Sequence, residues 1–191
     1  MAARAGSWLG GLMASKGMWS EPGTDPRDAL EAGRGERAVL AQYLDHYRLT
    51  LELKCEGLTA EQLATRSVPP STLSLLGLVR HLARVEHSWW RRVLEGQHDL
   101  PRLYRTDADP DLDFNGALPD DDLVADAWQS WRTEVAHARE VYAGLDLDAV
   151  VQVHGDDVEV RDVVVHLVEE YARHLGHADL LRECIDGRTG Q

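Results

Sequence analysis

The sequence predicts an all-α protein with the architecture of a four-helix bundle. Four long segments place apolar residues three and four positions apart, which is the spacing of helices that bury one face. A long irregular stretch between the second and third segments predicts one crossover connection that runs over the surface. Bundles of this kind build metal and ligand sites from side chains on facing helices. Polar side chains on the core-facing stripes are therefore the first place to look for function.

The first predicted helix covers residues 30–55 and ends before Gly57. After it, Thr59 is a good N-cap for one short helical turn in the segment LTAEQL, and two consecutive prolines stiffen the connection that follows. The apolar residues of the first helix recur at helical spacing: Val39, Leu40, Tyr43, Leu44, Tyr47 and Leu51.

The second predicted helix begins with Ser71 or Thr72 as its cap, runs to Glu95 and is closed by Gly96. His81 lies close to its core-facing side, because apolar residues precede it by three positions and follow it by four. Three arginines follow one side of this helix, and we expect them to form a solvated face: Arg80, Arg84 and Arg91.

The second half of the chain contains the crossover and two further helices. Residues 97–118 are rich in Asp, Pro and Gly and show no periodicity, so they form the predicted crossover. Pro119 and three aspartates favour a helix start, and this helix runs to Gly144. Alternating apolar residues in 147–159 predict a small hairpin or an extended connection. The last helix is predicted over Val160–Asp186.

Length and charge limit the classes of function. We expect a loosely ordered tail over residues 1–26 and a single domain over residues 27–191. The formal net charge of −13 would repel a phosphate backbone, which argues against nucleic-acid binding. No stretch approaches the roughly 18 apolar residues that span a bilayer, so no membrane segment is expected. Only two cysteines, Cys55 and Cys184, point to a reducing compartment and a cytoplasmic location.

The last helix carries four ionisable residues within its apolar stripe. His166, Glu170, His174 and His177 fall within an arc narrower than a quarter turn, at roughly 100° per residue. Charged groups on a core-facing stripe need an explanation, since such a stripe normally buries only apolar side chains. The apolar residues that share this face are Val163, Leu167, Tyr171, Ala178 and Leu181.

Two explanations of this stripe stay open from the residues alone. Glu170 and the histidines could form a hydrogen-bonded network that tolerates burial. Alternatively, Glu170 and His174 bind a metal ion from successive helical turns, and His81 supplies a third ligand from another helix. His166 and His177 would then orient these ligands or act as alternative ligands.

The ligand types leave the identity of the metal open. Nitrogen and oxygen ligands suit Zn²⁺ best here, and also Ni²⁺, Fe²⁺ or Mn²⁺. The late helix reads HLVEE where the zinc protease motif would read HExxH, so that hydrolytic motif is absent.

This pattern resembles the DinB-like superfamily of metal-binding four-helix proteins. Its late helix commonly reads H-x3-H-x3-H-R-G-Q, and the second and third histidines bind the ion with a histidine of the second helix. This chain reads H-x3-E-x3-H-x-G-H, and the resemblance over residues 30–188 assigns the three ligand positions to Glu170, His174 and His81. The glutamate departs from the all-histidine set, but the related mycothiol-dependent maleylpyruvate isomerase is similar in using a His/Glu/His zinc triad. The phrase EEYARHLGHADLLRE, followed by IDG, resembles a branch known only as a domain of unknown function.

The resemblance implies a thiol S-transferase that uses mycothiol or bacillithiol. A thiol bound to a divalent ion becomes a thiolate, which could attack an electrophile, while the 97–118 loop lines the pocket. A metal-dependent hydrolase and a non-enzymatic metal-binding or ligand-binding protein, including a homodimer, stay as alternatives. Four tryptophans could line a pocket or a dimer interface, although packing inside the bundle is the more common outcome: Trp89, Trp90, Trp128 and Trp131.

Overall fold

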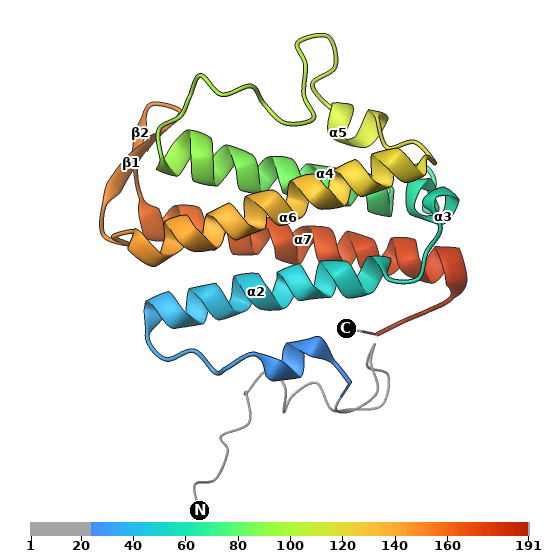
Figure 1. Cartoon of the computed structure of the whole chain (residues 1–191), viewed down its shortest axis with the longest axis horizontal. Coiled ribbons are helices and arrows are strands. Elements are labelled where there is room, and N and C mark those ends of the chain that lie inside the picture. The colour runs from blue at the N-terminus through green and yellow to red at the C-terminus, as the bar shows by residue number, and fades with distance from the viewer. Residues whose placement is uncertain (1–23, 191) are drawn as a thin grey trace, which may run out of the picture.

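Four long helices form the body of the protein. The computed structural model describes residues 24–190, so most of the predicted N-terminal tail lies outside the described residues. The long helices run side by side, and two short strands lie at one end of the bundle (Figure 1). This arrangement confirms the predicted all-α bundle. The long helices are α2 (Glu36–Cys55), α4 (Leu75–Glu86), α6 (Asp121–Gly144) and α7 (Val160–Asp186).

Short elements join the long helices. A 3₁₀ turn, η1 (Pro26–Ala29), precedes α2, and α3 (Ala60–Ala64) fills the connection to α4. Thr59 caps α3, as the sequence predicted, and the Gln62 side chain completes a capping box with it. The crossover passes over the outer side of α4 and contains one short helix, α5 (Leu112–Asn115), which the sequence did not predict (Figure 1).

Helix α4 lies at the centre of the core. It packs against α6 and α7, while α2 packs mainly against α7. Among the described helices, none is long and apolar enough to cross a membrane. Six apolar side chains of α4 are completely inaccessible to solvent: Leu75, Leu76, Leu78, Val79, Leu82 and Ala83.

Three predicted helix starts were wrong by two to six residues. Helix α2 begins at Glu36 and not at residue 30, because Gly35 precedes it with φ 78°, a left-handed conformation outside the helical region. Ser74 caps α4 by accepting a hydrogen bond from the Gly77 amide, whereas Ser71 bonds locally to Leu73. In α6 the cap is Asp120, whose side chain accepts from the amides of residues 122 and 123.

The second long helix is not a continuous α-helix. After Glu86 it widens into a π-helix, η2 (His87–Leu94), in which the Glu95 amide bonds to the Trp90 carbonyl five residues earlier. The two consecutive tryptophans in this π-helix have different environments. Trp90 is buried in the core, whereas Trp89 is half-buried and lies 4.7 Å from the His166 ring.

The predicted hairpin before the last helix is confirmed. Strands β1 (Val150–Val153) and β2 (Asp156–Glu159) pair in antiparallel register. The two residues of the turn, His154 and Gly155, both have positive φ, at 55° and 95°. This geometry matches the twist of the flanking strands in a two-residue hairpin. The hairpin therefore holds the His154 side chain at one end of the bundle, beside the start of α7.

A buried carboxylate connects three of the long helices. Glu86, at the end of α4, is fully buried and accepts two hydrogen bonds of 2.9 Å from the Arg48 guanidinium of α2. The Tyr171 hydroxyl of α7 and the Trp90 indole each donate to Glu86 at 2.6 Å. Trp131 of α6 in turn donates to the Tyr171 hydroxyl at 2.9 Å. The buried charge is therefore paired and fully hydrogen-bonded.

Breaking the Arg48–Glu86 pair should strongly destabilise the fold. The Arg48→Ala variant leaves the Glu86 carboxylate buried without a cation, which costs about 3–5 kcal/mol of unfolding free energy. Urea titration followed by circular dichroism measures this loss. Arg132→Ala breaks an exposed 3.7 Å pair with Glu52 and serves as the matched control, with an expected change below about 1 kcal/mol. Equal losses in the two variants would contradict the role assigned to the buried pair.

Candidate metal centre

Three ionisable side chains converge where α4 packs against α7. Nε2 of His174 lies 3.3 Å from Oε2 of Glu170, and Nε2 of His81 lies 3.7 Å from the same oxygen. One potential ligand atom from each residue lies within 4.8 Å of the other two, and within residues 24–190 no other group has this spacing. Ligands at about 2.0 Å from a tetrahedral Zn²⁺ stand roughly 3.3 Å apart, so the spacing is close to that of a metal site.

Asp113 of the crossover sets the orientation of His81. Its carboxylate is fully buried and lies 2.8 Å from Nδ1 of His81, so Nδ1 carries the donated proton. The His81 ring also stacks on Phe114, with the ring centroids 5.0 Å apart. Nε2 is thereby turned toward Glu170 and His174, and it is buried without a hydrogen-bond partner. A carboxylate that holds the far nitrogen of a histidine is the usual support of a metal-binding imidazole.

The electrostatics of the cluster favour a positive charge between the three residues. The neighbouring imidazoles, His174 first and then His81, hold the pKa of Glu170 far below its ordinary value. Burial alone would lower the pKa of His81, but the hydrogen bond to Asp113 and the nearby carboxylate of Glu170 raise it overall. The carboxylates that favour a proton on His81 also favour a cation in its place.

The other two predicted residues lie beside this group. Nε2 of His166 is 3.3 Å from Oε1 of Glu170, the oxygen that does not face His174. Nδ1 of His177 is 3.4 Å from Nδ1 of His174, and burial lowers the pKa of His177. Each therefore contacts one member of the group.

The sequence prediction that these four residues share the buried face of the last helix needs a correction. The buried arc of α7 is centred on other residues, and the polar group lies at its edge. Exposed fractions of the side chains are 40% for His166, 18% for Glu170 and 12% for His174. The edge position leaves the polar atoms within reach of solvent and of small molecules. The residues at the centre of the buried arc are Val164, Leu167, Tyr171 and Ala178.

The three arginines of the second helix do not form the solvated face that we expected. Arg80 is 4% exposed and donates to the main-chain carbonyls of Leu112 and Asp113. Arg84 donates to the Asp113 carboxylate at 2.9 Å and to the Pro110 carbonyl. Arg91 pairs with Glu134 of α6 at 2.6 Å. Two of the three therefore fasten the crossover to α4, and they hold Asp113 in place against His81.

Asp113 was not predicted as a functional residue from the sequence. The crossover contains five aspartates, and no spacing distinguishes this one from the other four. Its following residue, Phe114, is the single phenylalanine of the chain, and its hydrophobic side chain was the only local sign that this part of the loop packs inward.

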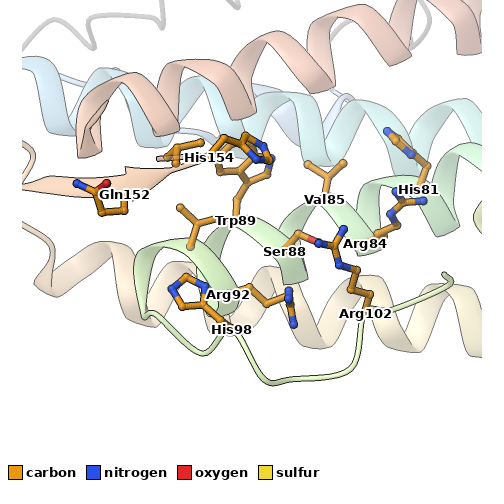
Figure 2. A pocket seen from close by; sticks show the side chains of 12 residues that line it. His81, Arg84, Val85, Ser88, Trp89, Arg92, His98, Arg102, Gln152 and His154 are labelled. Carbon is orange, nitrogen blue, oxygen red and sulfur yellow. The ribbon is translucent and has the colours of Figure 1, made fainter. Parts of the chain in front are cut away.

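A pocket opens directly beside the metal candidate. It has a volume of about 370 Å³ and extends from His81 along η2 to the hairpin (Figure 2). Trp89 and Arg92 line it from η2, Arg102 from the crossover and His154 from the hairpin turn. The expectation that the 97–118 loop lines the pocket is therefore confirmed. Of the four tryptophans that could line a pocket, Trp89 does so. Trp90 and Trp131 are instead buried in the core.

Fold and site together define the class of the protein. The four-helix bundle, with its His/Glu/His group between the second and last long helices, is consistent with a member of the DinB-like superfamily. Residues 39–187 match the family model described as Mycothiol-S-transferase, and the chain belongs to this family. The family implies a small-molecule thiol as a substrate. No curated protein matches the chain.

The contact between Asp113 and His81 should be visible in the titration of the imidazole. In metal-free protein we expect His81 to titrate above its ordinary value of 6.5, and Asp113→Asn to lower that pKa. Because the folded pKa is raised, His81 contributes stability below the unfolded pKa, and this contribution is lost as pH rises through the folded value. Two-dimensional NMR of the histidine ring signals measures the pKa of His81 in the wild-type protein and in the Asp113→Asn variant.

The exposed Asp107 of the same loop gives the control, since Asp107→Asn removes an equal charge away from His81. An unchanged His81 titration in the Asp113→Asn variant would contradict the proposed support.

Proposed function

We propose that the protein is a metal-dependent mycothiol S-transferase. In this proposal His81, Glu170 and His174 hold a divalent ion, and the ion takes the sulfur of a low-molecular-weight thiol in an open coordination position. The observation that carries the proposal is the convergence of three potential ligand atoms within 4.8 Å in a chain of this family, and one of these residues, His81, also lines a pocket.

The residues present fit such an ion. Nε2 of His81 is buried, lacks a hydrogen-bond partner and lies 3.7 Å from the Glu170 carboxylate, a position that a cation would satisfy. Two imidazoles and one carboxylate are ligands that Zn²⁺ accepts, and Ni²⁺, Fe²⁺ and Mn²⁺ accept them too. Three protein ligands leave a position for substrate, which distinguishes catalytic from purely structural zinc sites.

When bound, the divalent ion supplies the charge that converts a coordinated thiol, with an ordinary pKa near 8.5, into a thiolate at neutral pH. The residues of the chain prepare the site. Asp113 keeps the proton on Nδ1 of His81, so that the lone pair of Nε2 faces the site. His166 contacts Oε1 of Glu170 and leaves Oε2 to face the two histidines. The half-buried Trp89 covers one side of the pocket beside His166 and excludes water there.

The transfer itself balances without any redox step. The thiolate sulfur forms a bond to an electrophilic carbon, and the displaced group leaves with the electron pair of the broken bond. The thiol proton goes to solvent. The pocket beside His81 is where the electrophile would lie during this attack.

The hydrolase alternative has less support than the transferase. A metal hydrolase usually pairs its ion with a carboxylate base, as in the HExxH motif. Neither Asp nor Glu lines the described pocket, and Asp113 is occupied by His81 and Arg84. The family match favours thiol transfer, and no feature of the described residues favours a purely non-enzymatic role.

Metal binding is the first step to test. Untagged protein should contain one divalent ion per chain by mass spectrometry of the metals, and His174→Ala should reduce this content to a small fraction. His137→Ala removes a histidine that pairs with Glu95 away from the site, and it should retain the full metal content. A metal-free wild-type protein that takes up no Zn²⁺ on addition would rule out the proposed mechanism.

Transfer activity is the second step. The metal-loaded protein should form a fluorescent conjugate from mycothiol and monochlorobimane, and His174→Ala should lower kcat/KM by at least about 100-fold, since chemistry at neutral pH depends on the activated thiol. His137→Ala should stay near the wild-type rate. The same assay with bacillithiol or glutathione compares the thiols. Absence of conjugate with every thiol would contradict the transferase function.

A further inference from the structure

We infer that the pocket beside the metal candidate binds the anionic group, a carboxylate or a phosphate, of the electrophile. The claim that the bound anion belongs to the electrophile rests on the proposed transferase function. The anion part rests on the pocket itself, which has about 370 Å³ of space, enough for a small metabolite.

The charge of the pocket is opposite to the charge of the protein. The chain carries 33 acidic and 20 basic residues, yet three arginines and three histidines line the pocket and no acidic residue does. Arg92 is half-buried and Arg102 is exposed, so both guanidinium groups are within reach of solvent, and positive charges that line one hollow attract an anion to it. A lining that holds three arginines and no carboxylate suits an anion even in an acidic protein.

Two of the arginines are available to such an anion. The charge of Arg84 is taken up by Asp113, 2.9 Å away. Arg92 donates to the main-chain carbonyl of Leu100, which holds its side chain in place without neutralising it. Within residues 24–190, neither Arg92 nor Arg102 has a carboxylate within ion-pair distance. The planar guanidinium of arginine matches carboxylate and phosphate groups with two parallel hydrogen bonds.

The shape of the pocket orders the two reactants. Its lining residues follow one face of α4 and η2 from His81 through Trp89 to Arg92, a path of roughly 15 Å at about 1.5 Å per residue. Figure 2 shows His81 at one end, with His154 and Gln152 of the hairpin at the other. An electrophile whose anionic group binds Arg92 and Arg102 would direct its reactive carbon toward the His81 end, where the thiol is activated.

Mycothiol itself is a poorer occupant of the arginine-lined part. Apart from its thiol it is a neutral, polyhydroxylated molecule, so it offers no negative charge to the guanidinium groups of Arg92 and Arg102. The thiol therefore needs to reach the pocket only with its sulfur, at the His81 end.

An unsaturated carboxylic acid illustrates the step. The thiolate sulfur forms a bond to one alkene carbon while the carbon–carbon π bond breaks. The electron pair moves to the neighbouring carbon, which takes a proton from solvent. The carboxylate stays unchanged and serves only as the group that is held.

Binding tests the anion site without any catalysis. Isothermal titration of the full-length protein uses two probes, the unreactive 3-benzoylpropionate and inorganic phosphate, and shows which anion the site prefers. Arg102→Gln should weaken the binding of the preferred probe by at least about tenfold. Arg66→Gln removes an equal charge from an exposed position outside the pocket and should leave it within twofold. An anion bound only to the metal would be insensitive to Arg102. No binding of either probe, or equal binding by both variants, would overturn the inference.

Kinetics test the placement of the electrophile. With mycothiol as the thiol, 3-benzoylacrylic acid is compared with its neutral amide. Arg102→Gln should lower kcat/KM for the acid by about tenfold or more and change the amide by less than twofold. His154→Asn keeps a residue that tolerates positive φ in the turn. This variant reports whether the His154 imidazole contributes to the preference for the acid over the amide. Equal losses for acid and amide would overturn the inference. If wild type transfers to neither, the proposed transferase function fails, while the titration still decides the anion site.

Discussion

The buried carboxylate of Glu86 is the constraint on which the rest of the structure depends. A fully buried charge is tolerated only when every lone pair has a partner, and its partners come from α2, η2 and α7. These bonds determine how the helices stand relative to one another. Tyr171, which donates to Glu86, immediately precedes the turn that carries His174 and follows Glu170 in sequence. The hydrogen bond between Tyr171 and Glu86 therefore fixes the position of Glu170 along α7 relative to His81.

The metal candidate combines rigid support with partial exposure. His81 projects from a helix whose neighbouring residues are completely buried, and Asp113 holds its second nitrogen from the opposite side. Glu170 and His174 lie at the edge of the buried arc of α7, where their polar atoms remain accessible. A site deeper in the core would impose a larger desolvation cost on the ionised Glu170. A site on the fully exposed surface would not hold the three side chains in a fixed geometry.

The extent to which sequence predicts this structure depends on how local each feature is. The hairpin and the bounds of the last helix follow from nearby residues, and so does the one-sided clustering of Glu170 and His174. The pairing with His81 needed the additional knowledge that a bundle brings the second and last helices together. Asp113 and the inward turn of Arg80 could not be predicted, because each depends on where a non-periodic crossover docks. The π-helix could not be predicted either, because no local pattern of the sequence distinguishes it from a regular α-helix; the Trp90 indole within it donates to Glu86, four residues earlier.

The arginines of the pocket also resolve an electrostatic difficulty of the proposed chemistry. A thiolate and a carboxylate-bearing electrophile are both anions, and they would meet in a protein whose net charge is −13. Their mutual repulsion grows as the site excludes water, since charges interact more strongly at low dielectric. In the proposed chemistry Arg92 and Arg102 would neutralise the electrophile, and a divalent ion would neutralise the thiolate. The attack would then join two compensated charges. Acidic residues of the outer surface that lie more than about 8 Å away are largely screened at physiological salt, so they oppose the attack little.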